Sequence, residues 1–241
     1  MDYQAALEVY KAQTQNVRSL DKVINQIKRT INNRLKIGNN PGALIQTKIL
    51  ALTYSAWAEV SFSKLIHTPY GFNPDEMKQI KDEHKKGGLE RGWQKCLELA
   101  LRKLDASTRT NEVPNIRQKL SRYIKTYIIE PSIIRNKIAH GQWTIALNEG
   151  NTAANQKYTD RIADLDIVRI SIWIRVYEFL ENIIEDLIES PNRAFRRDYW
   201  GHLTGLDEFL SKAEDWSLQD KAKLLKKKYS YKPKAISFTR K

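Results

Sequence analysis

The first 36 residues contain neither glycine nor proline, and their apolar side chains recur at steps of three and four residues. Residues spaced in this way share one face of an α-helix, so the stretch predicts a single helix on the order of 50 Å long. The run GNNPG at 38–42 stops the helix and turns the chain. Because this connection is short, we expect a second, antiparallel helix over 43–66.

The middle of the chain continues in helical segments. Asn73 precedes a proline and an aspartate and is a suitable cap for a helix that runs to about residue 86. A glycine pair follows, and then a second apolar stripe over 89–104. A further helix over about 116–128 meets Pro131, which we expect to kink or restart it.

The last third of the sequence is less uniform. Residues 143–161 contain a turn sequence, NEGN, and indicate a loop with a small hairpin. Over 164–188 the apolar residues first alternate as in a strand and then step as in a helix. The length of this segment and its lack of turn residues favour one buried helix. With helices expected near 193–212 and 217–228, the fold class is all-α, an elongated helical bundle.

Composition excludes several classes of protein. A hydrophobic content of 41% in 241 residues is enough for an ordered core in one domain. The single cysteine, Cys96, excludes an internal disulfide or a cysteine-based zinc cage, and the four histidines lack metal-ligand spacing. We therefore expect no metal and no cofactor. The start has no signal-peptide pattern and no stretch is apolar over about 18 residues, so we expect a cytoplasmic protein without a membrane span.

Positive charge is concentrated at the C-terminal end. The chain has 41 Lys and Arg against 28 Asp and Glu, a net charge of +13. Nine basic residues and no acidic residue lie between Lys221 and Lys241. This asymmetry indicates a polyanionic partner, and RNA or DNA is favoured over a membrane because the segment lacks a broad apolar face. We therefore divide the chain into one domain over 1–220 and a basic tail over 221–241.

The stretch RNKIAHG, Arg135 to Gly141, combines residue types that can do chemistry. On a helix, Asn136 and His140 are four residues apart and share one face, whereas Arg135 lies about 140° from His140 around the axis. Gly141 suits a left-handed cap, so the histidine is expected in the last turn. There it lies near the carbonyl end of the helix, where a positive charge is favoured.

These side chains suit the cleavage of RNA without a metal ion. The 2′-hydroxyl must lose a proton as it attacks the phosphorus, and the leaving 5′-oxygen must gain one; histidine can do either near neutral pH. Arg135 can clamp phosphate oxygens with its planar guanidinium, and Asn136 can orient the histidine or the phosphate. One copy supplies only His140, so two copies meeting on a two-fold axis would complete the site.

An arginine, a polar residue, three further residues and a histidine at the end of a helix resemble the motif of the HEPN (higher eukaryotes and prokaryotes nucleotide-binding) superfamily. The matching residues are Arg135, Asn136 and His140. The resemblance is closest over 123–143 and looser over 43–189, and it does not include the tail. It implies a four- to five-helix bundle that forms a homodimer, with a composite, metal-independent endoribonuclease site. It also implies a role in prokaryotic toxin–antitoxin, abortive-infection or phage-defence systems, with an antitoxin or defence protein as partner.

One position departs from that resemblance. Members that are modified by a partner nucleotidyltransferase carry a tyrosine two residues after the histidine, and Gln142 stands there in this chain. Adenylylation at that position is therefore not expected.

Further residues are candidates for substrate binding, on a rim near the motif and along the tail. The lysines of the tail can follow a phosphate backbone while a tyrosine stacks on a base. Charged helix faces are commonly just solvated, so this alternative stays open for all of them. The candidates are Lys137, Arg122, Lys125, Lys226, Lys227, Lys228 and Tyr229.

Two classes of function follow. The first is an endoribonuclease in which His140 transfers protons, Arg135 stabilises the pentacoordinate phosphate and Asn136 orients. The second is a helical module that binds RNA or a partner protein without chemistry of its own, in which Arg135 and His140 form an ordinary helix end. A DNA-binding regulator ranks last, because no helix-turn-helix pattern is evident.

Overall fold

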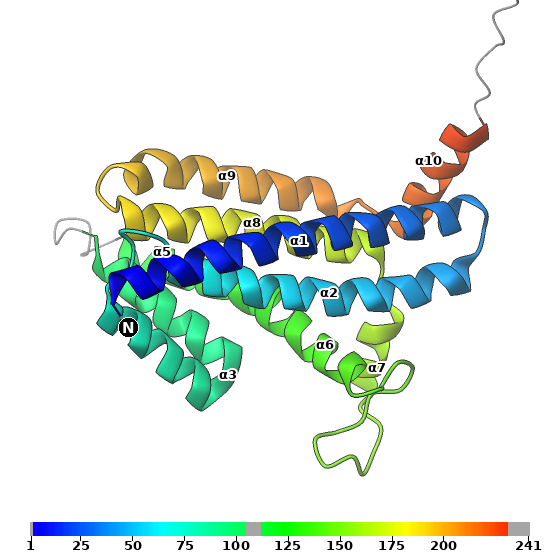
Figure 1. The fold of residues 1–241 in the computed structure, drawn as a ribbon. Coiled ribbons are helices and arrows are strands. Elements are labelled where there is room, and N and C mark those ends of the chain that lie inside the picture. The colour runs from blue at the N-terminus through cyan, green and yellow to red at the C-terminus, as the bar shows by residue number, and fades with distance from the viewer. Residues whose placement is uncertain (1, 105–111, 231–241) are drawn as a thin grey trace, which may run out of the picture.

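The computed structural model describes residues 2–104 and 112–230, with the backbone alone for 228–230. This part of the chain contains helices and no strand, which confirms the all-α prediction, and the helices form an elongated bundle (Figure 1). The helices are α1 (Tyr3–Lys36), α2 (Asn40–Ile66), α3 (Pro74–Arg102), α5 (Val113–Ile124), the π-helix η1 (Lys125–Ile129), α6 (Glu130–Ala139), α7 (Gln156–Ala163), α8 (Ile167–Glu189), α9 (Ala194–Glu214) and α10 (Leu218–Ser230).

Helices α1 and α2 form the antiparallel pair that the sequence predicts. The chain reverses at Gly38, whose φ of +76° lies in the left-handed region that glycine tolerates. The Asn39 side chain then accepts a hydrogen bond from the Gly42 amide at 2.9 Å and caps α2. This cap and a proline in the first turn start α2 at Asn40, three residues before the predicted beginning.

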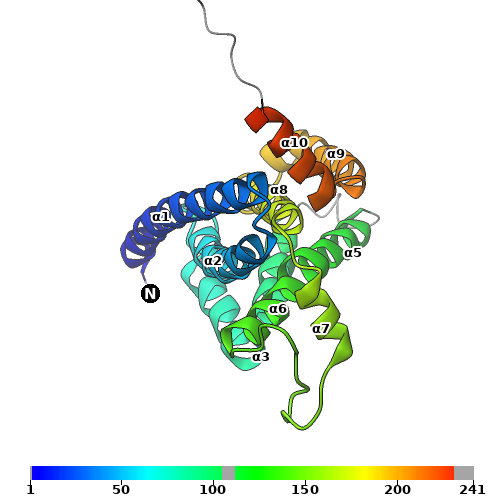
Figure 2. The same ribbon diagram turned by 90° about the vertical axis from the view of Figure 1, so that its right-hand side faces the viewer.

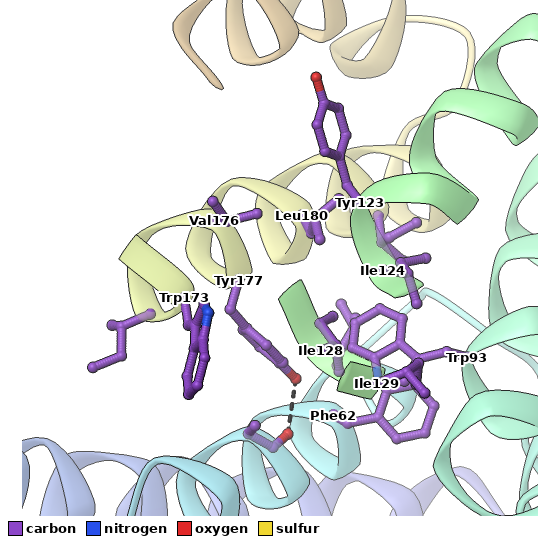
Figure 3. Close-up of a cluster of buried hydrophobic side chains, with 14 of the residues drawn as sticks. Phe62, Trp93, Tyr123, Ile124, Ile128, Ile129, Trp173, Val176, Tyr177 and Leu180 are labelled. Carbon is purple, nitrogen blue, oxygen red and sulfur yellow. Dashed lines mark hydrogen bonds between the residues drawn. The ribbon is translucent and has the colours of Figure 1, made fainter. Parts of the chain in front are cut away.

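Helix α8 is buried on nearly all sides and lies at the centre of the bundle. Its first half alternates as a strand would, but the segment is a helix in which Val168, Ile170, Ile174 and Val176 are all buried by neighbouring helices. Asp166 caps it by accepting from the amides of Val168 (2.6 Å) and Arg169 (2.9 Å). The Tyr177 hydroxyl donates to the carbonyl of Ala58 on α2 at 2.9 Å, which ties α8 to α2 inside the core (Figure 3).

Pro131 does not break the helix in which it lies. Helices α5, η1 and α6 follow one another without a gap, and the π-helical turn of η1 comes directly before the proline. In an α-helix the amide of residue 131 would bond to the carbonyl of Tyr127, but proline has no N–H. The buried Tyr54 hydroxyl of α2 donates to that carbonyl instead, at 3.0 Å. Burial raises the pKa of Tyr54, so its hydroxyl keeps the proton that it donates.

The predicted hairpin over 143–161 is wrong in its second half. A single antiparallel bridge joins Leu147 and Ala154, and residues 156–163 form helix α7. Asn155 accepts a hydrogen bond from the Tyr158 amide at 3.3 Å and so caps α7, and Ile162, four residues further on, is buried against the core. The asparagine cap and this helical spacing outweigh the turn sequence that precedes them.

The basic C-terminal segment begins as a helix that is packed on the bundle. Helix α10 contacts α1 and α8, and Leu218 and Leu225 pack against the core (Figure 2). Residues 231–241 lie outside the described part of the chain. Among the described helices, none combines the length and apolar character needed to cross a bilayer.

The bond between Tyr54 and Tyr127 generates a testable prediction. Tyr54→Phe leaves the Tyr127 carbonyl without this donor and should lower the free energy of unfolding by about 1–3 kcal/mol. For a chain of this size that corresponds to a fall in Tm of about 2–4 °C per kcal/mol, measured by circular dichroism. Tyr70→Phe, which alters a hydroxyl on a side chain that is 95% exposed, is the matched control.

A double-mutant cycle tests the physical reason. Pro131→Ala restores an amide that can bond to the Tyr127 carbonyl. In that background, Tyr54→Phe should therefore lower the free energy of unfolding by clearly less than it does in the wild type. Equal costs with and without the proline would show that the tyrosine does not compensate for the missing N–H.

Candidate functional site

The motif occupies the last turns of α6. His140 ends this helix, and its amide donates to the Asn136 carbonyl at 3.0 Å. Gly141 follows with φ of +81°, and its amide donates to Ile138 while that of Gln142 donates to Lys137, both at 3.0 Å. The left-handed glycine cap predicted from the sequence is therefore confirmed. The cap leaves the histidine exposed at the end of the helix.

His140 and Asn136 lie on one open groove of about 890 Å³. One wall is the end of α6 and the other is the loop that follows it. Two further polar side chains of this loop, Asn148 and Asn151, and the carboxylate of Glu149 also line the groove. His140 and the Asn136 carboxamide give proton transfer and neutral hydrogen bonds to the same space, whereas the Asn148 carboxamide is bonded within the loop to Thr152.

Hydrogen bonds fix the loop wall of this groove to the helices. The amide of Leu147 donates to the Gln142 side chain at 2.8 Å, and its carbonyl accepts from the Lys137 ammonium at 2.6 Å. The Ala146 amide donates to the Thr159 hydroxyl of α7 at 3.0 Å. Lys137, a predicted substrate-binding residue, therefore stabilises the wall in this structure. Gln142, in the position where the resembling family carries a modifiable tyrosine, does the same.

A buried cation from α2 supports the wall from behind. The Lys48 ammonium donates to the Trp143 carbonyl and lies 5.7 Å from the centre of the Trp143 ring. The side chain is 8% exposed, and burial lowers the pKa of Lys48 below its usual value. The Trp143 ring nitrogen in turn donates to Ile138 at 3.0 Å, so the start of the loop is held against α2 and α6.

Arg135 points away from the groove. Its guanidinium forms an ion pair with Glu59 of α2, where the arginine side chain is 27% exposed and the carboxylate 51%. The Arg135 Nε atom is buried without a hydrogen-bond partner. The structure thus brings Asn136 and His140 together on one groove and places Arg135 on a neighbouring face of α6, as their angular separation on a helix requires.

The other predicted substrate-binding residues do not gather at this groove. Arg122 lies over the Tyr123 ring at 5.3 Å, and Lys125 is an exposed residue of η1. Lys226 and Lys227 lie on α10, which sits on the opposite side of the bundle from α6 and α7 in both views (Figures 1 and 2). The side chains of Lys228 and Tyr229 lie outside what the structure describes.

Sequence reasoning missed Glu59 and Lys48. Both are charged residues within α2, an otherwise largely apolar helix. For Lys48, which is buried, this setting was the available signal, since a charge on a helix packed in a core is normally paired; the exposed Glu59 gave no such signal. Across residues 2–104 and 112–230, no three His, Cys, Asp or Glu side chains are grouped so that they could hold a metal ion. Comparison of the chain with models of known protein families, with curated proteins and with solved structures finds no match.

The hydrogen bonds of the loop predict how the groove responds to a substitution. Gln142→Ala removes the acceptor of the Leu147 amide, so hydrogen exchange in the peptide covering 143–149 should become about tenfold faster or more. Mass spectrometry measures this exchange. Gln94→Ala, which removes an exposed bond to Glu90, should leave the same peptide unchanged. Unchanged exchange in the Gln142 variant would show that this side chain does not hold the wall.

Proposed function

We propose that this chain is a metal-independent endoribonuclease of HEPN type, acting within a prokaryotic defence or toxin–antitoxin system. The observation that carries the proposal is the exposed His140 beside Asn136 on one open groove, at the end of a helix in a basic protein. His140 takes the proton of the 2′-hydroxyl as that oxygen attacks the phosphorus. The P–O5′ bond then breaks, and a second acid protonates the leaving oxygen to give a 2′,3′-cyclic phosphate and a 5′-hydroxyl.

The charge of the groove supports a site shared by two copies. Of the residues that line it, Lys137 is bonded to the Leu147 carbonyl and Glu149 carries a negative charge. One groove therefore offers a phosphodiester little net positive charge and a single histidine. A second copy related by a two-fold axis adds a second His140, which supplies the acid. The exposed apolar side chain of Ile145, on the same groove, is suited to such a contact.

In this mechanism Arg135 must leave its ion pair with Glu59 and bind the phosphate of the substrate. A phosphate that reaches the guanidinium competes with the half-exposed carboxylate of Glu59. An ion pair at this degree of exposure contributes little to stability, on the order of 0–1 kcal/mol, so the exchange costs little. Arginine then binds the phosphate oxygens through two parallel N–H donors, which suits the crowded charge of the pentacoordinate state.

The same ion pair favours a second candidate function. Because Arg135 is engaged by Glu59 and faces away from the groove, the chain can instead be a binding module that takes up RNA or a partner protein without cleaving it. In that case the end of α6 is structural, and the basic helix α10 carries the affinity for RNA.

An assay of RNA cleavage by the purified protein in EDTA distinguishes the endoribonuclease from the binding module. His140→Ala should lower the rate by about 10²–10⁴-fold, because the transfer of a proton in the transition state is lost. His202→Ala is the matched control, since this histidine lies on α9 and pairs with Asp186 at 3.2 Å. The wild type and this control should cleave alike.

Three outcomes contradict the proposal. They are the absence of cleavage by the wild type, equal cleavage by the His140 variant, and loss of cleavage on treatment with EDTA. A monomer mass from light scattering at concentrations that support cleavage would contradict the shared site alone.

The binding module makes a separate prediction. RNA affinity, measured by fluorescence anisotropy, should fall steeply with salt and should fall again in Lys226→Gln/Lys227→Gln. It should not change in His140→Ala. An RNA affinity that changes neither with salt nor on substitution of the two lysines would show that α10 does not bind RNA.

A further inference from the structure

Glu59 also lines a second cavity, a pocket of about 260 Å³ between α2 and α3. Its floor is apolar and includes Phe62 and Ile66 of α2. Its rim carries Lys81, His84 and Lys85 of α3. The pocket is therefore adjacent, through one carboxylate, to the arginine of the motif.

The three rim residues share one face of α3, because they are spaced as i, i+3 and i+4. The neighbouring carboxylate of Glu83 points elsewhere and pairs with Lys86 at 2.9 Å and with Arg91 at 3.9 Å. Glu59 is thus the one carboxylate among the residues that line the pocket. Burial lowers the pKa of Lys81, and the positive charge of Lys85 lowers it further, which shows that cationic groups are crowded here.

The pocket is built by the kink in α3. Gly88 has φ of +69°, and the chain leaves helical geometry at Gly87 and Gly88. The kink folds the second half of α3 back, so that a Cβ on Gly92 would lie 2.9 Å from His84 Cδ2. In a straight helix residues eight positions apart are separated by about 12 Å. The imidazole is thus packed against Gly92 on one side and lies 6.4 Å from the Phe62 ring on another.

We propose that this pocket binds a phosphoryl group, held by the ammonium groups of Lys81 and Lys85 and by the ring of His84. Lysine binds phosphate as a point charge, and a histidine on the same rim adds a hydrogen-bond donor. The inference rests on the proposed function in that the group belongs to the RNA, as an internal phosphodiester or a terminal phosphate. A substrate that lies across Glu59 then contacts the α2–α3 pocket and the Arg135 face of α6 together.

Glu59 distinguishes this pocket from a general basic surface, because removing its charge should strengthen the binding of an anion. Its carboxylate repels an anion in the pocket, and its pairing with Arg135 removes part of the positive field around it. Glu59→Gln removes the repulsion and leaves Arg135 without this partner. Both effects strengthen the binding of a phosphoryl group.

Proton NMR of the His84 ring tests the proposal in the full chain, with the signal assigned from the spectrum of His84→Gln. The probes are inorganic phosphate and a deoxydinucleoside monophosphate, which lacks the attacking 2′-hydroxyl, each at fixed pH and ionic strength. We expect saturable shifts. The dissociation constant should rise about tenfold or more in Lys81→Gln/Lys85→Gln and fall in Glu59→Gln. Lys78→Gln/Lys86→Gln, with the same change in net charge on the same helix, should match the wild type.

The two probes distinguish the sources of the group. Shifts with inorganic phosphate alone assign the pocket to a terminal phosphate, and shifts with both probes assign it to internal phosphodiesters. No saturable shift with either probe, or equal weakening in the two lysine pairs, overturns the proposal. Because no probe is cleaved, a negative result with intact RNA cleavage rejects the pocket alone, whereas binding without cleavage rejects the nuclease alone.

Discussion

The burial of most of α8 is the constraint on which the rest of the structure depends. A helix that is apolar around most of its circumference is stable in water only when other helices cover its apolar surface. Here α2, α3, α5 and α9 cover this surface and leave exposed only polar residues such as Arg175 and Asn182. Aromatic rings from α2 and α3 meet Tyr177 of α8 in the core (Figure 3). The buried hydroxyl of Tyr177 needs a hydrogen-bond acceptor. Its bond to the Ala58 carbonyl fixes the position of α2 along α8.

This position in turn determines which side chains of α2 contact the segment that contains α6. Tyr54 donates to the Tyr127 carbonyl, Glu59 pairs with Arg135, and Lys48 supports the loop after His140. Three polar side chains of one helix therefore position the segment that carries the motif. The π-helical turn before Pro131 keeps that segment continuous with α5, so the end of α6 projects from the bundle and bears an exposed histidine.

Helix α6 presents its polar residues on two faces with different surroundings. Asn136 and His140 face an open groove of low net charge, whereas Arg135 faces α2 and the cationic pocket beyond Glu59. Under the proposed function, a single carboxylate, that of Glu59, thus lies between Arg135 and the cationic pocket. An RNA strand that bridges the two faces gains positive charge from α3 that the groove itself lacks.

The sequence by itself determined the helices and their order, because apolar spacing, caps and glycine turns act within a few residues. The start at Asn73 and the left-handed Gly141 followed from such local chemistry, as did the angle between Arg135 and His140. The segment 143–161 was predicted less well, since one turn sequence competed there with a helix cap. Only the tertiary structure decided the partners: that Glu59 meets Arg135, that Lys48 lies behind Trp143, and that the kinked α3 forms a cationic pocket with α2. Those contacts join residues up to 95 positions apart, and no local pattern encodes which helices pack together.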